Sequence, residues 1–251
     1  MSAEDLYDLF SERKSEIDAY LDLLRSIDTE SKSGVPRLGA SRACKQEDDG
    51  TPITTVQVNI LQSCLFLLLY NLVEAIVTRF LEEISNAIDE ADISASELNF
   101  PLREEWIRSF AKTEERDLNP KSRLDIAIAL CEHILEQRRI DNFKITRSGG
   151  GNWDDQAIEK YLVRIGGIGL LPEEPKAKAK HNVRDNDGAL VLVRKYRNAL
   201  AHGRLSFADC SEDVYYNWLE NLSCTVVDYV EGLVKCCGEF IEEKYFTLHS
   251  Q

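Results

Sequence analysis

Apolar residues recur at helical spacing through most of the chain. The first such run predicts a helix that begins near Ser2 and carries one apolar face to about Ile27. Its apolar positions are Leu6, Phe10, Ile17, Leu21 and Leu24. A second predicted helix, from about Ile53 to Ala91, is apolar around most of its circumference. A helix of that kind lies in the centre of a bundle or at a subunit contact.

The remaining helical patterns are shorter, except for a long one at the C-terminal end. They cover about 102–112, 120–140, 154–165, 187–202 and 211–245. No run of alternating β-branched residues predicts a sheet, and no internal repeat is found. We therefore expect a single all-α domain over residues 1–251, a helical bundle with a long apolar central helix. A polar loop or linker is expected at about 28–52 and an exposed Gly/Pro/Lys loop at about 166–183.

The charge balance excludes one class of nucleic-acid-binding protein. The chain has 30 basic and 44 acidic residues, a formal net charge of −14. This argues against a protein that coats nucleic acid by bulk charge, but it allows a small basic site. Positive side chains gather at 184–205, and Arg194, Lys195 and Arg204 are the candidates for RNA binding. For the lysines at 176–181, a solvated loop and an RNA contact stay equally open.

Polar interruptions in the most hydrophobic stretch, Val58–Leu81, argue against a membrane span. They are Asn59, Gln62, Asn71, Glu74 and Arg79. The seven cysteines are odd in number and include no C-x-x-C pair. This predicts free thiols and a cytoplasmic protein. No metal-ligand spacing and no phosphate-cradling Gly-Lys-Ser/Thr loop is present, so neither a metal nor a cofactor is expected.

The most informative segment is RNALAHG at residues 197–203, at the end of a predicted helix. Arg197 and His202 are five residues apart, so they lie roughly 140° apart around a helix axis. Asn198 and His202, four residues apart, share a face. A site that uses Arg197 and His202 together would converge more easily across two copies of the helix, which predicts a homodimer. Alone, this spacing is also met by a histidine that ends a helix and an arginine in a surface ion pair.

The sequence around this motif resembles the HEPN superfamily, in particular the bacterial HEPN-like nucleases of toxin–antitoxin and phage-defence systems. The segments that carry the resemblance are GGGNWDDQAIEKYLVRIGGIG at 149–169, RNALAHG, and LSF at 205–207. The early LFSERKSEIDAYL and LLLYNLVEAIV segments fit the same branch. The likeness covers most of the chain, and residues 29–52 are its least constrained part.

The resemblance implies a metal-independent ribonuclease whose site lies in the cleft of a homodimer. Cleavage through the 2′-OH needs a proton acceptor and a cation, which suits His202 and Arg197 as catalytic residues. Asn198 would support them by orienting His202 or a phosphate. Asn71 and Glu74, taken as buried in the central helix, need partners. Glu74 pairs either with Arg197 or with a neighbouring helix, and both interpretations stay open.

An unregulated ribonuclease would harm its host, so the resemblance also implies a cognate antitoxin or regulatory protein. The alternative is a non-catalytic HEPN module that binds RNA, a nucleotide or a partner protein with the same pocket.

Overall fold

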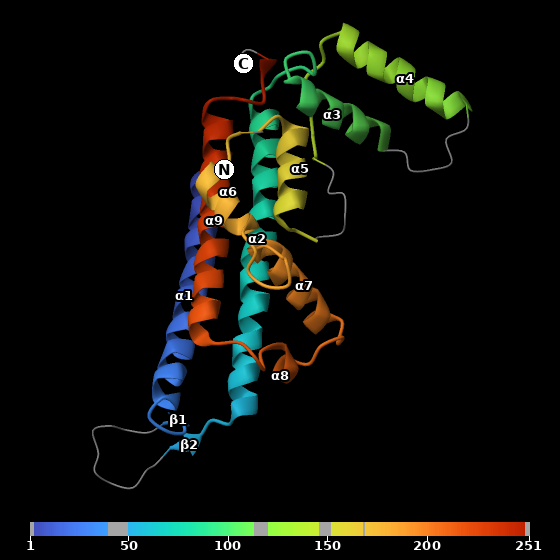
Figure 1. Cartoon of the computed structure of the whole chain (residues 1–251). Helices are drawn as coiled ribbons and strands as arrows, with labels where there is room; N and C mark the ends of the chain where they lie inside the picture. The colour runs from blue at the N-terminus through green and yellow to red at the C-terminus, as the bar shows by residue number, and fades with distance from the viewer. Residues whose placement is uncertain (1–2, 40–49, 113–119, 146–151, 168, 249–251) are drawn as a thin grey trace. The chain divides into compact units, whose positions relative to one another are not determined.

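The computed structural model describes residues 3–39, 50–112, 120–145, 152–167 and 169–248. These residues form helices joined by loops and one short β-ladder, so the all-α prediction is confirmed (Figure 1). The elements are α1 (Ala3–Ser31), β1 (Arg37–Leu38), β2 (Thr51–Pro52), α2 (Thr55–Glu90), α3 (Phe100–Lys112), α4 (Pro120–Leu135), α5 (Asp155–Ile165), α6 (Glu173–Lys180), α7 (Ala189–Ala201), α8 (Phe207–Cys210) and α9 (Tyr216–Glu242).

The chain divides into two compact units. The first unit consists of Met1–Leu9, Glu74–Lys176 and Glu231–Gln251, and the second of Phe10–Val73 and Ala177–Val230. Helices α1, α2 and α9 each contribute residues to both units. The single domain over residues 1–251 stays a prediction beside this division.

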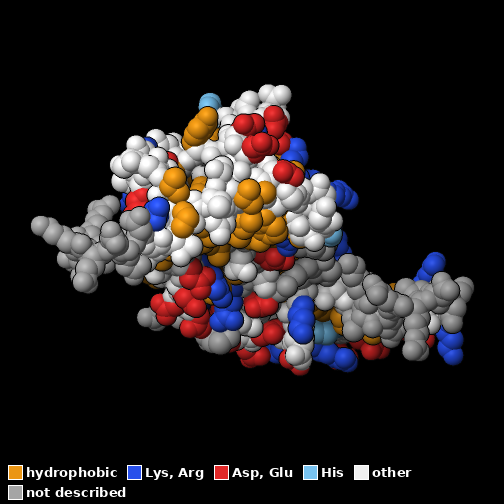
Figure 2. Space-filling view, turned by 90° about the horizontal axis from the view of Figure 1, so that it is seen from below, with side chains coloured by type: hydrophobic (Ala, Val, Ile, Leu, Met, Phe, Trp, Pro, Cys, Tyr) orange, Lys and Arg blue, Asp and Glu red, His pale blue; other side chains and the backbone are white. Residues whose placement is uncertain are grey.

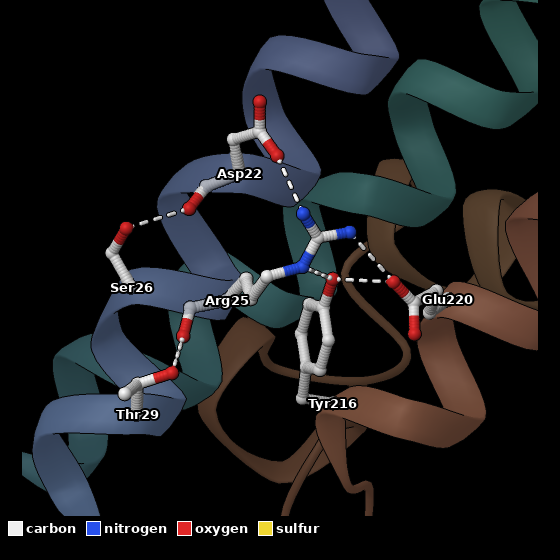
Figure 3. A network of polar contacts seen from close by, with 6 residues as sticks. All are labelled: Asp22, Arg25, Ser26, Thr29, Tyr216 and Glu220. Carbon is white, nitrogen blue, oxygen red and sulfur yellow. Dashed lines mark hydrogen bonds and ion pairs between the residues drawn. The ribbon is translucent and has the colours of Figure 1, made fainter.

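The second unit packs α1, the first half of α2, α7 and the first half of α9 around apolar side chains. Its buried residues include Ile17, Leu24, Leu65, Phe66, Leu69, Leu190, Val193, Leu222 and Val226. At the surface, Arg25 of α1 reaches α9 (Figure 3). Its guanidinium donates to the Tyr216 hydroxyl at 3.0 Å and to the Glu220 carboxylate at 2.8 Å. The hydrogen bond from Arg25 to Glu220 lowers the pKa of that carboxylate. The network ties α1 to α9 from the solvent side.

In the first unit, two buried polar side chains anchor α3. Asn99 is fully buried, and its amide donates to the carbonyls of Ile165 at 3.1 Å and Tyr245 at 2.7 Å. Its oxygen accepts from the Leu102 backbone, which caps α3. Glu105, also buried, accepts two hydrogen bonds from Arg164 of α5 at 2.9 and 2.5 Å. These contacts replace the water that the two polar groups lose on burial.

The structure corrects the two predicted loops. Helix α1 continues to Ser31, and β1 and β2 form an antiparallel ladder inside the predicted loop 28–52, of which 40–49 lies outside the described residues. The predicted loop 166–183 contains helix α6. Its alternating alanines and lysines are good helix formers, and Pro175 falls in the first turn, where backbone N–H groups have no helical partner. Two glutamates begin the helix and lysines end it, as the helix dipole favours.

Helix α2 is long and apolar enough, by length and composition, to cross a membrane. Half of its most apolar 18-residue window is buried inside the protein. The core helix of a soluble protein passes the same test of length and composition, so α2 is weak evidence for a span. The burial predicted for Asn71 is wrong, because this side chain is exposed. The cysteines of the described residues are free thiols, as predicted, and Cys44 lies outside them.

An apolar groove of about 350 Å³ lies in the second unit between the end of α1, the β1–β2 ladder and the start of α2. Leu23, Leu38, Ile60 and Leu61 line part of it. Figure 2 views the molecule from below. Apolar side chains are exposed on this face among uncharged side chains, and acidic side chains form clusters in both its upper and its lower half.

Candidate functional site

Helix α7, which carries most of the RNALAHG motif, is held in the second unit by its apolar side. Leu190, Leu192 and Val193 are buried, and the ring of Tyr196 lies 4.6 Å from that of Phe66 in α2. The helix begins after Gly188, where a Cβ would come within 2.5 Å of the Ala179 carbonyl oxygen. Only glycine allows so close an approach of the two backbones. The candidate site therefore sits on a helix whose start and inner face are both fixed.

Arg197 is half-buried and points toward α2. Its guanidinium carbon lies 4.0 Å from the centre of the Tyr70 ring, and the ring is almost fully buried. One guanidinium nitrogen donates to Oδ1 of Asn198 at 2.8 Å. A cation over an aromatic face is attracted by the electrons of the ring, and the hydrogen bond adds a direction to that contact. Ring and amide together hold the charge in one orientation.

His202 occupies a different environment, at the exposed C-terminal end of α7. It is the residue at which the helix ends, and its backbone N–H donates to the Asn198 carbonyl at 3.1 Å. Gly203 follows with a φ of 66° and turns the chain away. Among the described residues, no hydrogen bond or ion pair of the His202 imidazole is found. This side chain is exposed and accessible from solvent.

The motif residues are thus only partly brought together. Asn198 contacts Arg197 through its side chain and His202 through its backbone, so its side chain orients the arginine. Lys195 forms an ion pair with Asp187 at 2.6 Å, which offsets part of its charge. Arg204 is exposed and Arg194 half-buried. The catalytic roles of Arg197 and His202 stay predictions, and so do the RNA-binding roles of the three basic residues around them.

In a comparison with protein-family models, residues 2–246 match the HEPN_MAE_28990-like HEPN family. The chain belongs to this HEPN family. The match includes the RNALAHG segment and all the helices described above. HEPN membership indicates a nuclease-like or RNA-binding module of a kind that commonly dimerises. No curated protein and no solved structure matches the chain.

Tyr70 is the residue of this HEPN site that the sequence analysis missed. It stands in the run LLLYNLVEA, where it was counted only as part of an apolar helix. The one tyrosine of this apolar helix, one turn before an acidic residue, is a signal that could have drawn attention to it. Glu74 lies one turn beyond Tyr70 on the same face of α2 and is half-buried. Its pairing with Arg197 stays a prediction.

Three or more metal-ligating side chains do not cluster anywhere in the described part of the HEPN chain. The candidate site itself holds an arginine, an amide, a tyrosine ring and a histidine at the end of one helix. Such groups can bind a phosphate, stabilise negative charge and exchange a proton.

Proposed function

We propose that this HEPN protein is a metal-independent endoribonuclease that acts as a homodimer through Arg197 and His202. The observation that carries the proposal is the fixed orientation of the Arg197 guanidinium over Tyr70, on the helix that ends at an exposed histidine. The family match to a nuclease-like or RNA-binding module supports it.

In the proposed reaction the substrate supplies its own nucleophile. His202 accepts the proton of an RNA 2′-OH, and the oxygen attacks the adjacent phosphorus. The bond from phosphorus to the 5′-oxygen then breaks, and the leaving oxygen takes a proton, which leaves a 2′,3′-cyclic phosphate and a 5′-OH. Arg197 binds the phosphate oxygens and stabilises the charge that develops on them. Asn198 keeps the guanidinium directed, and Arg194, Lys195 and Arg204 bind the RNA backbone.

Positions on α7 favour a site shared by two chains. Arg197 is bound to its own chain at Tyr70 and Asn198, whereas the His202 side chain is exposed at the helix end. A second chain could bring its histidine to the arginine of the first. The same argument makes a cognate antitoxin or other regulatory protein part of the proposal, since covering the exposed end of α7 would block the site. A cytoplasmic location fits this role.

The proposal is tested by incubating the purified protein with a single-stranded RNA in EDTA and analysing the ends of the products. We expect cleavage with 2′,3′-cyclic phosphate ends. Activity should fall at least about 100-fold in Arg197→Ala and His202→Ala, the size usual for a general base. His181→Ala, which removes another exposed histidine of the second unit, should retain full activity. Cleavage that persists in both site variants would refute the assignment.

RNA binding without cleavage in the same assay would favour the non-catalytic HEPN module. In that case Arg197→Ala should weaken RNA binding, and neither the native protein nor the two variants should change the RNA chemically. Growth arrest on expression, relieved by His202→Ala, would support the role as a toxin or defence effector.

A further inference from the structure

Helix α4 of the first unit turns an apolar face to solvent. None of residues 121–135 is buried. Four large apolar side chains of this helix are exposed: Leu124 by 59%, Ile128 by 47%, Ile134 by 39% and Leu135 by 82%. Cys131 is exposed as well. Most of the stability of a helix in a protein comes from the packing of its apolar face, and this face of α4 stays exposed among the described residues.

Most of the exposed apolar residues form one stripe on the side away from α3, and Ile134 lies beside it. The opposite side of α4 packs on α3, where the His133 ring lies 4.9 Å from the ring of Trp106. Leu124, Ile128, Cys131 and Leu135 are spaced by four, three and four residues. At 100° per residue they fall within about 60° of one another and roughly opposite His133. This spacing is that of the contact face, or seam, of a two-stranded coiled coil. In that pattern Ile128 and Leu135 occupy positions a, and Leu124 and Cys131 occupy positions d.

We propose that this stripe is covered by α4 of a second copy of the chain, in parallel orientation. Ile128 at position a and Leu124 at position d match the combination that favours two parallel strands. The second a and d positions hold leucine and cysteine and do not add to this preference. The charges beside the stripe favour the same orientation. In an antiparallel pair, Asp125 would lie beside Glu132 of the second copy, and both are acidic. In a parallel pair, Glu132 faces the uncharged Ala127 of the second copy instead.

Parallel pairing makes a specific prediction for Cys131. At position d it lies in the same layer as its counterpart, where facing Cα atoms come close enough for a disulfide. In an antiparallel pair the same cysteine would face Ile128. The contact on α4 is separate from the shared site proposed on α7, and its test does not use RNA cleavage.

The full-length protein is treated with a mild oxidant at increasing concentrations, and covalent dimers are measured on a non-reducing gel. We expect a covalent dimer that falls at least about tenfold in Cys131→Ser and is unchanged in Cys224→Ser, which removes another exposed cysteine. Ile128→Glu should abolish the dimer, since it puts a charge at the centre of the seam. Val163→Glu changes a residue of similar exposure on α5 and should not.

Circular dichroism should show the same helix content in both glutamate variants, because both residues are exposed. A covalent dimer that survives Cys131→Ser would overturn the parallel pair. The proposal also fails if the protein forms no covalent dimer, or if Ile128→Glu and Val163→Glu behave alike. A dimer by light scattering that Ile128→Glu disrupts, without any Cys131 link, would show antiparallel pairing and contradict the orientation.

Discussion

Replacing Tyr70 by leucine removes the ring on which the Arg197 guanidinium rests, and its energetic effect can be worked out from the structure. The ring is 2% exposed and the cation lies 4.0 Å from its centre, so the contact is largely shielded from water. Cation–π contacts are worth about 0.5–1 kcal/mol at exposed sites and about 2 kcal/mol when desolvated. With Arg197 half-buried, we expect about 1–2 kcal/mol.

A double-mutant cycle isolates this energy from the loss of packing. Tyr70→Leu, Arg197→Met and the double variant are unfolded with urea, and the coupling energy is taken from the three changes in the free energy of unfolding. Tyr70→Leu alone should cost more than the coupling, because it also leaves a cavity. Tyr70→Phe keeps the ring and should retain most of the coupling with Arg197. A coupling energy below about 0.3 kcal/mol would refute the idea that the ring holds the guanidinium.

The contact between Tyr70 and Arg197 also connects the stability of the protein with its proposed activity. If the ring directs Arg197 at a phosphate, its loss should reduce RNA cleavage by the free energy of the contact, roughly 5- to 30-fold for about 1–2 kcal/mol. Tyr70→Phe is then the activity control, since it removes only the hydroxyl. A leucine variant that is folded and fully active would show that the contact serves packing alone.

Three further predictions concern the framework, each measured by urea unfolding. Asn99→Ala leaves three backbone groups without their partner, two of them buried, and should destabilise the first unit by about 2–4 kcal/mol, more than a surface Asn→Ala control. Burial raises the pKa of Glu105, but the hydrogen bonds and charge of Arg164 outweigh burial, so the net pKa is lowered. The stability that this pair contributes should therefore be lost as the pH falls below about 4.3. Glu105→Gln should lack this contribution to the pH dependence. Gly188→Ala places a Cβ against the Ala179 carbonyl and should cost about 1–3 kcal/mol; an unchanged midpoint would contradict the close approach.

The helices that build the site follow from periodicity, which is a local property of the sequence. Helix α7 was predicted at 187–202 and found at Ala189–Ala201, because its apolar spacing and Gly203 mark both its face and its end. The contact of Arg197 with Tyr70 could not be predicted in this way. It joins residues more than 100 positions apart in the sequence, and periodicity says which side of a helix is buried but not what it packs against.

Two predictions made from the sequence were wrong, the burial of Asn71 and the loop at α6, and each has a physical cause. Asn71 was expected to be buried because α2 is apolar around most of its circumference, but the helix still keeps an exposed side, where Asn71 lies. Helix α6 was missed because prolines and glycines flank it, although its own Lys/Ala sequence favours a helix. For Asn71 the local sequence does not fix which side of the helix is buried. For α6 two local signals conflict, and the helix-forming one prevails.

The proposed sharing of the site between two chains can be decided by mixing two inactive variants. Arg197→Ala lacks the cation and His202→Ala lacks the proton acceptor, so each is expected to be inactive alone. If the arginine of one chain acts with the histidine of its partner, a mixed dimer regains one intact site out of two. Half of the dimers are mixed after equal exchange, so about a quarter of the native activity should return. If both groups act within one chain, no chain in the mixture holds the pair, and the activity should stay at the level of the separate variants.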